Sequence, residues 1–165
     1  MPIREMSVRV SRQGGQLQVL YRLEGDLGAL QLPEPAEARR TDELWRHTCF
    51  EAFVRHAAPE TEYCEYNFSP SGAWAAYHFS GYRADMRNLG IRTAPDISIG
   101  REKDALTLVA TIDARWTQSA SGGALRLGVT AVIEDRSGLL SYWALKHPPG
   151  KADFHHADGF VLDVS

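Results

Sequence analysis

Residues 45–79 read WRHTCFEAFVRHAAPETEYCEYNFSPSGAWAAYHF, and their pattern is the strongest structural signal in the chain. Three runs within this segment alternate between apolar and polar side chains, and two groups of turn-forming residues separate the runs. Alternation with a period of two is typical of a strand that buries one face. The segment therefore predicts a three-stranded antiparallel meander, with further strands on either side of it.

The first connection of the meander, at residues 57–61, predicts a hairpin. In the register that this connection favours, one face is apolar, with the cross-strand pairs Val54–Cys64, Ala52–Tyr66 and Phe50–Phe68. Side chains alternate between faces, so the other face pairs Glu51 with Asn67 and Phe53 with Glu65. A polar face is thus predicted directly behind a core face.

The second connection, Ser69-Pro70-Ser71-Gly72, is a turn signal that allows two registers. A three-residue loop with a glycine bulge would place Trp74 beside Phe68 in the core. A two-residue loop would place Trp74 on the polar face, beside Asn67 and Glu51. The two registers differ by one residue, and such a slip moves every side chain of the third strand to the opposite face.

The composition of the third strand favours the second of these registers. A two-residue loop buries Tyr77 and Phe79, whereas the alternative buries His78. An imidazole is more costly to bury than a phenyl ring. We therefore expect Trp74 on the polar face, with Tyr77 and Phe79 in the core.

The flanking regions also alternate and predict an all-β fold. Strands are expected at residues 6–12, 16–24, 106–113, 125–133, 141–145 and 160–164, with shorter ones near 30–32, 91 and 97. Glycine-bearing turns separate several of them, and Gly122-Gly123 ends the loop that follows residue 113. About ten short strands at this spacing predict a β-sandwich or a barrel, and we favour a two-sheet antiparallel β-sandwich as a single domain over residues 1–165.

The charge and the hydropathy of the chain exclude several classes of partner. A formal net charge of −3 over 165 residues, without a cluster of Lys and Arg, gives no footprint for nucleic acid or an anionic membrane. No apolar run reaches the length of a membrane span or a signal peptide, so we expect a cytoplasmic protein. Cys49 and Cys64 would lie roughly 17 Å apart on opposite faces, which predicts two free thiols.

No glycine-rich phosphate loop, GxSxG elbow, HExxH or CxxC motif is present. Glu51 and Glu65 could form the carboxylate pair of a glycoside hydrolase, although a solvated strand face also carries such pairs. His147, Asp153, His155 and His156 are of types that bind transition metals, but adjacent side chains of an extended chain point in opposite directions. Hydrogen bonding within a long loop is the simpler role for these residues, and we predict neither catalysis nor a metal site.

Several residues of the meander predict a sugar-binding surface instead. Trp74 on the polar face would present an aromatic plate beside Glu51, Glu65 and Asn67, and Trp45 enters the first strand of the meander. Aromatic rings stack on the CH groups of sugars, and carboxylate, amide and guanidinium groups bind the hydroxyls. The commoner role of a tryptophan is core filling, and the predicted register decides between the two.

The runs LWRHTCFEAFV, EYNFSPSGAWAAYHFSGYR and SYWALKHPPGKADFHH resemble the bacterial DOMON-like domains, which are related in fold to the family 9 carbohydrate-binding modules. The likeness spans nearly the whole chain. It implies a two-sheet β-sandwich that binds a ligand without chemistry. The wider superfamily includes sugar binders, which hold the saccharide between two tryptophans, and haem-binding domains, which ligate iron with one Met and one His.

The leading hypothesis is a non-enzymatic domain that binds a carbohydrate or a related polar metabolite, with no cofactor. Trp74 and Trp45 would stack on the ligand, Glu51, Glu65 and Asn67 would bind its hydroxyls, and the rim would consist of Arg46, His147, Lys151 and His155. The alternatives are a haem protein, in which Met86 pairs with a histidine of the late loop, and a protein-interaction module without a small ligand.

Overall fold

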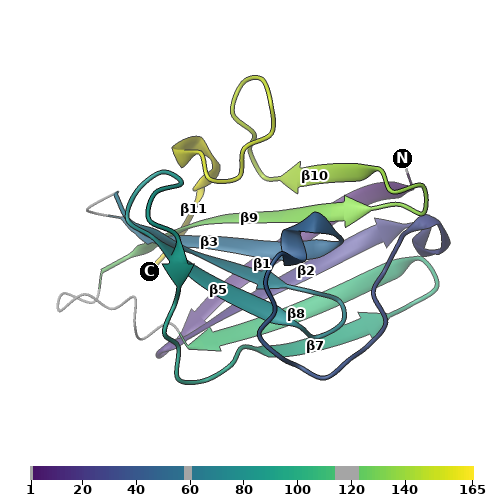
Figure 1. Ribbon diagram of the computed structural model, residues 1–165, viewed down its shortest axis with the longest axis horizontal. Helices are drawn as coiled ribbons and strands as arrows, with labels where there is room; N and C mark the ends of the chain where they lie inside the picture. Colours follow the sequence, from purple (N-terminus) through teal and green to yellow (C-terminus); the bar gives the residue numbers. More distant parts are fainter. Residues whose placement is uncertain (1, 58–60, 114–122) are drawn as a thin grey trace.

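The computed structural model describes residues 2–57, 61–113 and 123–165. Its strands form two antiparallel sheets that stack on one another, one of four strands and one of seven (Figure 1). The described residues contain three short 3₁₀ helices and no α-helix. The predicted all-β, two-sheet antiparallel sandwich is therefore confirmed.

The four-stranded sheet has the order β1-β2-β8-β7. Its strands are β1 (Ile3–Gln13), β2 (Gln16–Gly25), β7 (Asp96–Arg101) and β8 (Ala105–Asp113). Every second residue of β2 from Leu17 to Leu23 is fully buried, as the alternation in the sequence predicts for a strand with one face on the core. The opening hairpin and the strand near residues 106–113 are thus confirmed.

The seven-stranded sheet has the order β10-β9-β3-β4-β5-β6, and β11 also pairs with β9. Its strands are β3 (Cys49–His56), β4 (Tyr63–Phe68), β5 (Trp74–Phe79), β6 (Arg87–Asn88), β9 (Leu125–Glu134), β10 (Leu140–Ala144) and β11 (Leu162–Val164). The strand expected near residue 91 is not formed, because residues 89–95 contain no strand and the preceding β6 ends at Asn88. Residues 58–60 of the first meander connection and Gly122 lie outside the described residues.

The register between β3 and β4 is the predicted one. Glu51 pairs with Asn67 and Phe53 with Glu65, so these four side chains share the outer face of the sheet. The cross-strand pairs of the inner face are Phe50–Phe68, Ala52–Tyr66 and Val54–Cys64. Both cysteines are free and buried, as expected.

The register between β4 and β5 differs from the expected one. Trp74 pairs with Phe68 and packs in the core between the sheets, where its side chain is 8% exposed. The turn explains the difference, because Gly72 adopts a φ of +97° and adds one residue to the loop, as in a glycine bulge. The expected position of Trp74 on the polar face is therefore wrong.

The observed register turns His78 inward and Tyr77 and Phe79 outward, and both changes cost little in the folded protein. The Nε2 atom of His78 lies 3.0 Å from Oε2 of Glu62, so its imidazole has a polar partner. Tyr77 and Phe79 point outward but are only 3% exposed, because other segments cover the outer face. The strands of the meander are consequently buried on both faces.

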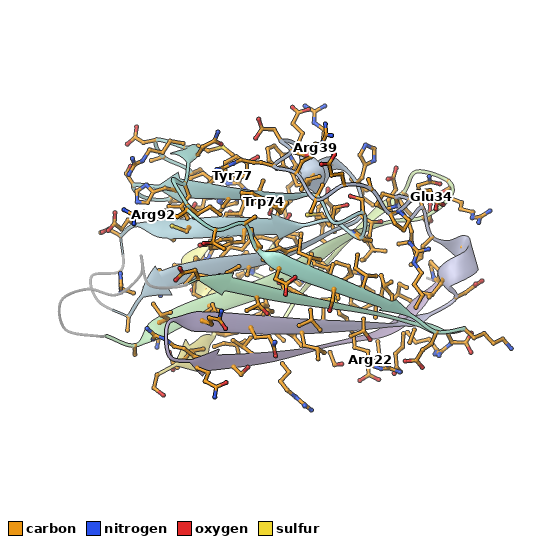
Figure 2. The ribbon with its side chains drawn as sticks, turned by 90° about the horizontal axis from the view of Figure 1, so that it is seen from below. Arg22, Glu34, Arg39, Trp74, Tyr77 and Arg92 are labelled. Atoms are coloured by element: carbon orange, nitrogen blue, oxygen red, sulfur yellow. The ribbon has the colours of Figure 1, made fainter. Side chains whose placement is uncertain are left out.

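Aromatic and aliphatic side chains of both sheets fill the space between them (Figure 2). Tyr21, Phe50, Tyr66 and Phe68 are among the largest fully buried side chains, and each such side chain contributes about 1.5–3 kcal/mol through burial. The hydroxyl of Tyr21 donates a hydrogen bond of 2.6 Å to the backbone oxygen of Glu51. This bond joins the four-stranded sheet to the strand that carries the polar outer face.

Candidate functional site

The outer face of the seven-stranded sheet carries the polar residues that the sequence places together. Glu51 and Glu65 are diagonal neighbours on β3 and β4, and Thr130 of β9 lies opposite Glu51. Tyr77 and Phe79 of β5 continue this face beyond β4. The face is therefore mixed, with two acids between aromatic residues.

Two segments cover part of this face and leave a cleft between them. The first is the 3₁₀ helix η2 (Leu44–Arg46), and the second is residues 152–160, here called the covering segment. Aromatic side chains of both segments pack on the sheet and form a second hydrophobic cluster, which contains Leu44, Trp45, Phe53, Tyr63, Ala75, Tyr77, Phe79, Phe154 and Phe160. The cleft is thus built over a hydrophobic layer of its own, separate from the core between the sheets.

Gly128 allows the covering segment to approach the sheet. A Cβ atom at this position of β9 would lie 2.9 Å from the backbone oxygen of Gly159. Side chains do not tolerate such a distance to a backbone atom, so only glycine permits this contact without a shift. The position of Phe154, His155 and Phe160 above the sheet therefore depends on a glycine at residue 128.

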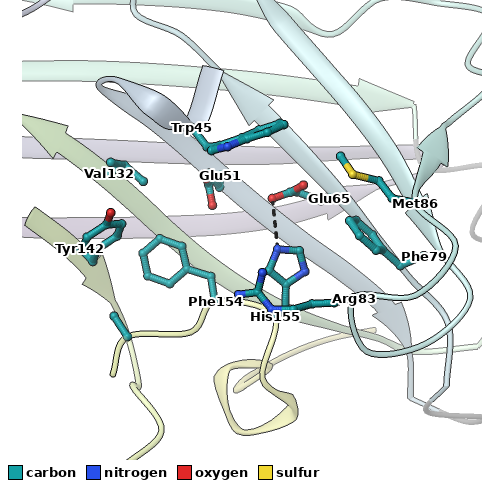
Figure 3. Close-up of a pocket in the computed structure, with 11 residues that line it drawn as sticks. Trp45, Glu51, Glu65, Phe79, Arg83, Met86, Val132, Tyr142, Phe154 and His155 are labelled. Carbon is teal, nitrogen blue, oxygen red and sulfur yellow. Dashed lines mark ion pairs between the residues drawn. The ribbon is translucent and has the colours of Figure 1, made fainter. Parts of the chain in front are cut away.

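The cleft contains a cavity of about 370 Å³. In Figure 3 the carboxyl groups of Glu51 and Glu65 lie between the indole of Trp45 on one side and Phe154 and His155 on the other. The lining residues are Trp45, Glu51, Glu65, Phe79, Arg83, Met86, Val132, Tyr142, Ala152, Phe154 and His155. The cavity thus has a floor with two acids and walls that are mainly aromatic.

Both floor acids are withdrawn from water. Glu51 is 2% exposed and Glu65 is 4% exposed. Burial raises the pKa of Glu65 to about 7, and it raises the pKa of Glu51 well above its usual value, with a further contribution from the negative charge of Glu65. The Oε2 atom of Glu51 accepts a hydrogen bond of 3.2 Å from the hydroxyl of Thr130.

His155 is held in place by its ring contacts and by one hydrogen bond. Its Nδ1 lies 2.7 Å from the hydroxyl of Tyr63, and its Nε2 lies 3.8 Å from Oε1 of Glu65. The backbone N–H of Arg83 donates to the oxygen of Tyr63, which leaves the Tyr63 proton for Nδ1 and a proton on Nε2 that faces Glu65. Burial, together with the charge of Arg83, lowers the pKa of His155 to about 4, so the imidazole is neutral at pH 7.

An ion pair connects the loop after β5 to the covering segment. The guanidinium of Arg83 lies 2.8 Å from Oδ1 of Asp153, and the hydroxyl of Tyr82 donates to the same carboxylate. Although burial alone would raise the pKa of Asp153, these hydrogen bonds lower it below its usual value. The positive charge of Arg83 at the cleft is therefore already matched by Asp153.

Four of the nine predicted site residues line the cavity, namely Trp45, Glu51, Glu65 and His155. Asn67 shares the face of Glu51 but is fully buried and does not line the cavity, and its side-chain amide has no hydrogen-bond partner among the described residues. The structure thus brings together the acids and one of the two predicted aromatic plates.

The other four predicted residues lie away from the cavity lining. Trp74 is in the core on the opposite face of the sheet, with the guanidinium of Arg40 5.2 Å from its ring centroid. Arg46 is exposed and pairs with Glu43, while His147 and Lys151 are exposed beyond the lining of the cavity.

Sequence reasoning missed most of the cavity walls. Phe79 was assigned to the core with the wrong register of β5, and Tyr142 follows from the β9–β10 hairpin, because it alternates with the inward-facing Trp143. Phe154 and Arg83 lie in irregular segments, and no pattern in the sequence predicts their direction. Only the register of β5 and the alternation of β10 were signals that could have identified wall residues.

The described residues offer a suitable set of ligands neither for a metal ion nor for a haem. Within residues 2–57, 61–113 and 123–165, no three His, Cys, Asp or Glu side chains form a group that could hold a metal ion. Met86 and His155 both line the cavity, but they do not fit as the axial ligands of a haem. Tyr63 binds Nδ1 of His155, and an iron on Nε2 would need the space that separates this atom from the buried Glu65.

Comparisons with known proteins bear on the fold. No protein-family model matches the chain, and no curated protein matches it. Among solved structures, the chain is similar to a protein of Bacteroides uniformis that is provisionally described as carbohydrate-binding, with a TM-score of 0.68 and 13% sequence identity. The superposition covers 98% of this chain and 78% of that protein, and at this identity it supports the sandwich fold. No helix among the described residues is long and apolar enough to cross a membrane.

Proposed function

We propose that the chain binds a carbohydrate or a related polar metabolite in the cleft between η2 and the covering segment. The observation that carries this proposal is the pair of buried acids at the floor of a cavity with aromatic walls. Sugars present apolar CH faces and a ring of hydroxyls, so they are bound by aromatic rings and by a few fixed polar groups. Trp45 and Phe154 supply the rings, and Glu51 and Glu65 supply the polar groups.

The size of the cavity and the two likenesses agree with such a ligand. A cavity of about 370 Å³ is within the range of small-molecule sites. The similar Bacteroides uniformis protein is provisionally described as carbohydrate-binding, and the sequence resembles DOMON-like domains, whose relatives include sugar binders. These likenesses support a binding role for the cleft and leave the identity of the sugar open to experiment.

Binding without chemistry is the role that the arrangement of the acids favours. A glycoside hydrolase places its two carboxyl groups on either side of the scissile bond. It also needs one of them protonated and the other ionised, whereas burial raises the pKa of both Glu51 and Glu65. We therefore expect no hydrolysis of aryl glycosides by the purified protein.

The experiment that tests this function is calorimetry and thermal shift with a panel of monosaccharides and oligosaccharides, followed by Trp45→Ala. Removal of the indole should weaken binding about tenfold or more, because one stacking wall is lost. Arg46→Ala is the matched control, since Arg46 belongs to the same short helix but is exposed and pairs with Glu43. It should bind as the original chain does.

Three results would contradict the proposal. A panel that produces no heat and no shift in melting temperature would remove the sugar-binding function, and a partner protein captured at the cleft would favour the interaction module. Equal loss of binding in Trp45→Ala and Arg46→Ala would mean that binding depends on the conformation of η2 and not on the indole of Trp45.

A further inference from the structure

The cavity floor has an excess of acidic groups. Glu51 and Glu65 both line the cavity, and the basic residues that line it are Arg83 and His155. Arg83 is paired with Asp153, and His155 faces Glu65 at 3.8 Å as a neutral ring. The charge of Arg83 favours the ionised form of Glu65 but does not offset the effect of burial on its pKa, and no described residue of the lining forms an ion pair of Arg or Lys with either acid.

The hydrogen bonds of the two acids lead to the same conclusion. Glu51 accepts one hydrogen bond, from Thr130, through a single carboxyl oxygen. Glu65 is 4% exposed and accepts no hydrogen bond from the described residues. A buried carboxyl group without partners is costly, and such a group gains the most from a ligand that brings a hydrogen-bond donor with a positive charge.

The walls of the cavity also suit a cation. Trp45 lies on one side of the acids and Phe154 on the other, as Figure 3 shows, and Phe79 and Tyr142 also contribute to the lining. Aromatic faces attract cations through their quadrupole, and the attraction to an ammonium group is stronger in a desolvated site than at an exposed one. A neutral sugar would use the apolar surface but would bring no positive charge to the two acids.

We propose that the sugar bound in this cleft is an amino sugar, whose protonated amine lies at the two floor acids beside Trp45 while the ring stacks on the aromatic walls. This inference rests on the proposed sugar-binding function and adds the chemical class of the ligand. The groups that face the amine are Glu51 from β3, Glu65 from β4, Arg83 from the loop after β5 and His155 from the covering segment. A uronic acid would meet like charges at the floor.

The test is calorimetry at pH 7 with matched ligands. Glucosamine, galactosamine and mannosamine, and a chitosan tetramer, are each compared with the parent neutral sugar and with the N-acetyl form. An amine with a pKa of about 7.7 is largely protonated at this pH, whereas the N-acetyl form carries no charge. We expect at least one amino form to bind about tenfold or more tightly than both of its matched neutral forms.

The variant Glu65→Gln tests the contact itself, because it keeps the shape and removes the acid. It should reduce the affinity for the amino form about tenfold and leave the affinity for the parent sugar within about threefold. Glu62→Gln is the matched control, because this substitution removes the same charge from an exposed residue next to the same strand. Glu62 pairs with His78 there. It should leave the amine preference intact.

The outcomes separate the two proposals. Neutral forms that bind as tightly as the amino forms, or a Glu65→Gln variant that keeps the amine preference in a folded protein, would overturn the amino-sugar inference while sugar binding stands. Absence of binding across the whole set, with a correctly folded protein by circular dichroism, would overturn both. An equal loss in Glu65→Gln and Glu62→Gln would show a long-range charge effect and would also overturn the contact.

Discussion

At the scale of single residues, Glu65 combines a possible ligand contact with a cost in stability. Its pKa is about 7 in the folded protein because burial disfavours the charged form, and it is 4.5 in the reference state. When folding raises the pKa of a carboxyl group, the group does not change the free energy of unfolding below its pKa in the unfolded chain. As pH rises from that value to the pKa in the folded protein, the free energy of unfolding falls. The free energy of unfolding therefore falls between about pH 4.5 and pH 7, and above pH 7 the loss amounts to about 3 kcal/mol.

The substitution Glu65→Gln should therefore stabilise the protein above pH 7 by up to about 3 kcal/mol and have little effect near pH 4.5. Urea unfolding of both proteins at several pH values measures this difference, because groups distant from Glu65 titrate alike in the two proteins. Loss of the Glu65 charge also removes one cause of the raised pKa of Glu51, which acts in the same direction. A difference that is independent of pH, or one that grows as pH falls, would contradict the raised pKa. The acids of a binding site thus lower the stability of a sheet face that is otherwise hydrophobic.

At the scale of secondary-structure elements, the turn between β4 and β5 decides which tryptophan reaches the cleft. Trp74 lies in the core in the observed register, so Trp74→Ala should leave a large cavity and lower the free energy of unfolding by about 3–5 kcal/mol. Trp45 is only half-buried on η2, and its removal should cost less than about 2 kcal/mol. Chemical denaturation of the two variants measures the contrast, and equal costs would contradict the assigned register.

The sequence predicts the register of β3 and β4 because the connection at residues 57–61 sets the pairing and the residues of one face are all apolar, namely Phe50, Ala52, Val54, Cys64, Tyr66 and Phe68. It predicts the wrong face for β5 because the choice rested on two assumptions, that Tyr77 and Phe79 need the inner core and that His78 would be buried without a partner. Neither assumption holds, since the outer face has its own hydrophobic cover and Glu62 pairs with His78. Long-range cover of this kind comes from residues 44–46 and 152–160, whose positions local patterns do not encode.

The same limit applies to the candidate site. Glu51 and Glu65 follow from alternation within one meander, so the sequence is sufficient to group them. Contrary to expectation, Trp45 does not enter the first strand, because it lies on η2 and β3 begins at Cys49. Phe154 and His155 reach the cleft only because the covering segment folds back over β9. His155 is about 90 residues from Glu65 in the chain, so no local pattern links the two residues. The exposed His147 and Lys151 precede the same segment but do not line the cavity, although the ring of His147 stacks on Phe154 with 6.2 Å between the centroids. Composition alone does not distinguish them from His155.

At the scale of the whole molecule, the seven-stranded sheet separates two hydrophobic layers. The inner layer lies between the sheets and contains most of the large buried side chains, while the outer layer consists of the cluster beneath η2 and the covering segment. The inner layer includes residues of both sheets and needs no residue of the covering segment. We therefore expect the sandwich to remain folded when the outer layer is disturbed, with the cleft as the part that is lost.

Gly128→Ala tests this separation, because its Cβ would meet the backbone of Gly159 at 2.9 Å and displace the covering segment. The free energy of unfolding should fall by about 1–3 kcal/mol, ligand binding should weaken about tenfold or more, and the far-UV circular dichroism should stay that of a β-protein. Gly100→Ala is the matched control, since Gly100 lies in β7 with open space around its Cβ position and should leave binding unchanged. Complete unfolding of Gly128→Ala would show that the two layers form one cooperative unit, and full binding would show that the covering segment is not part of the site.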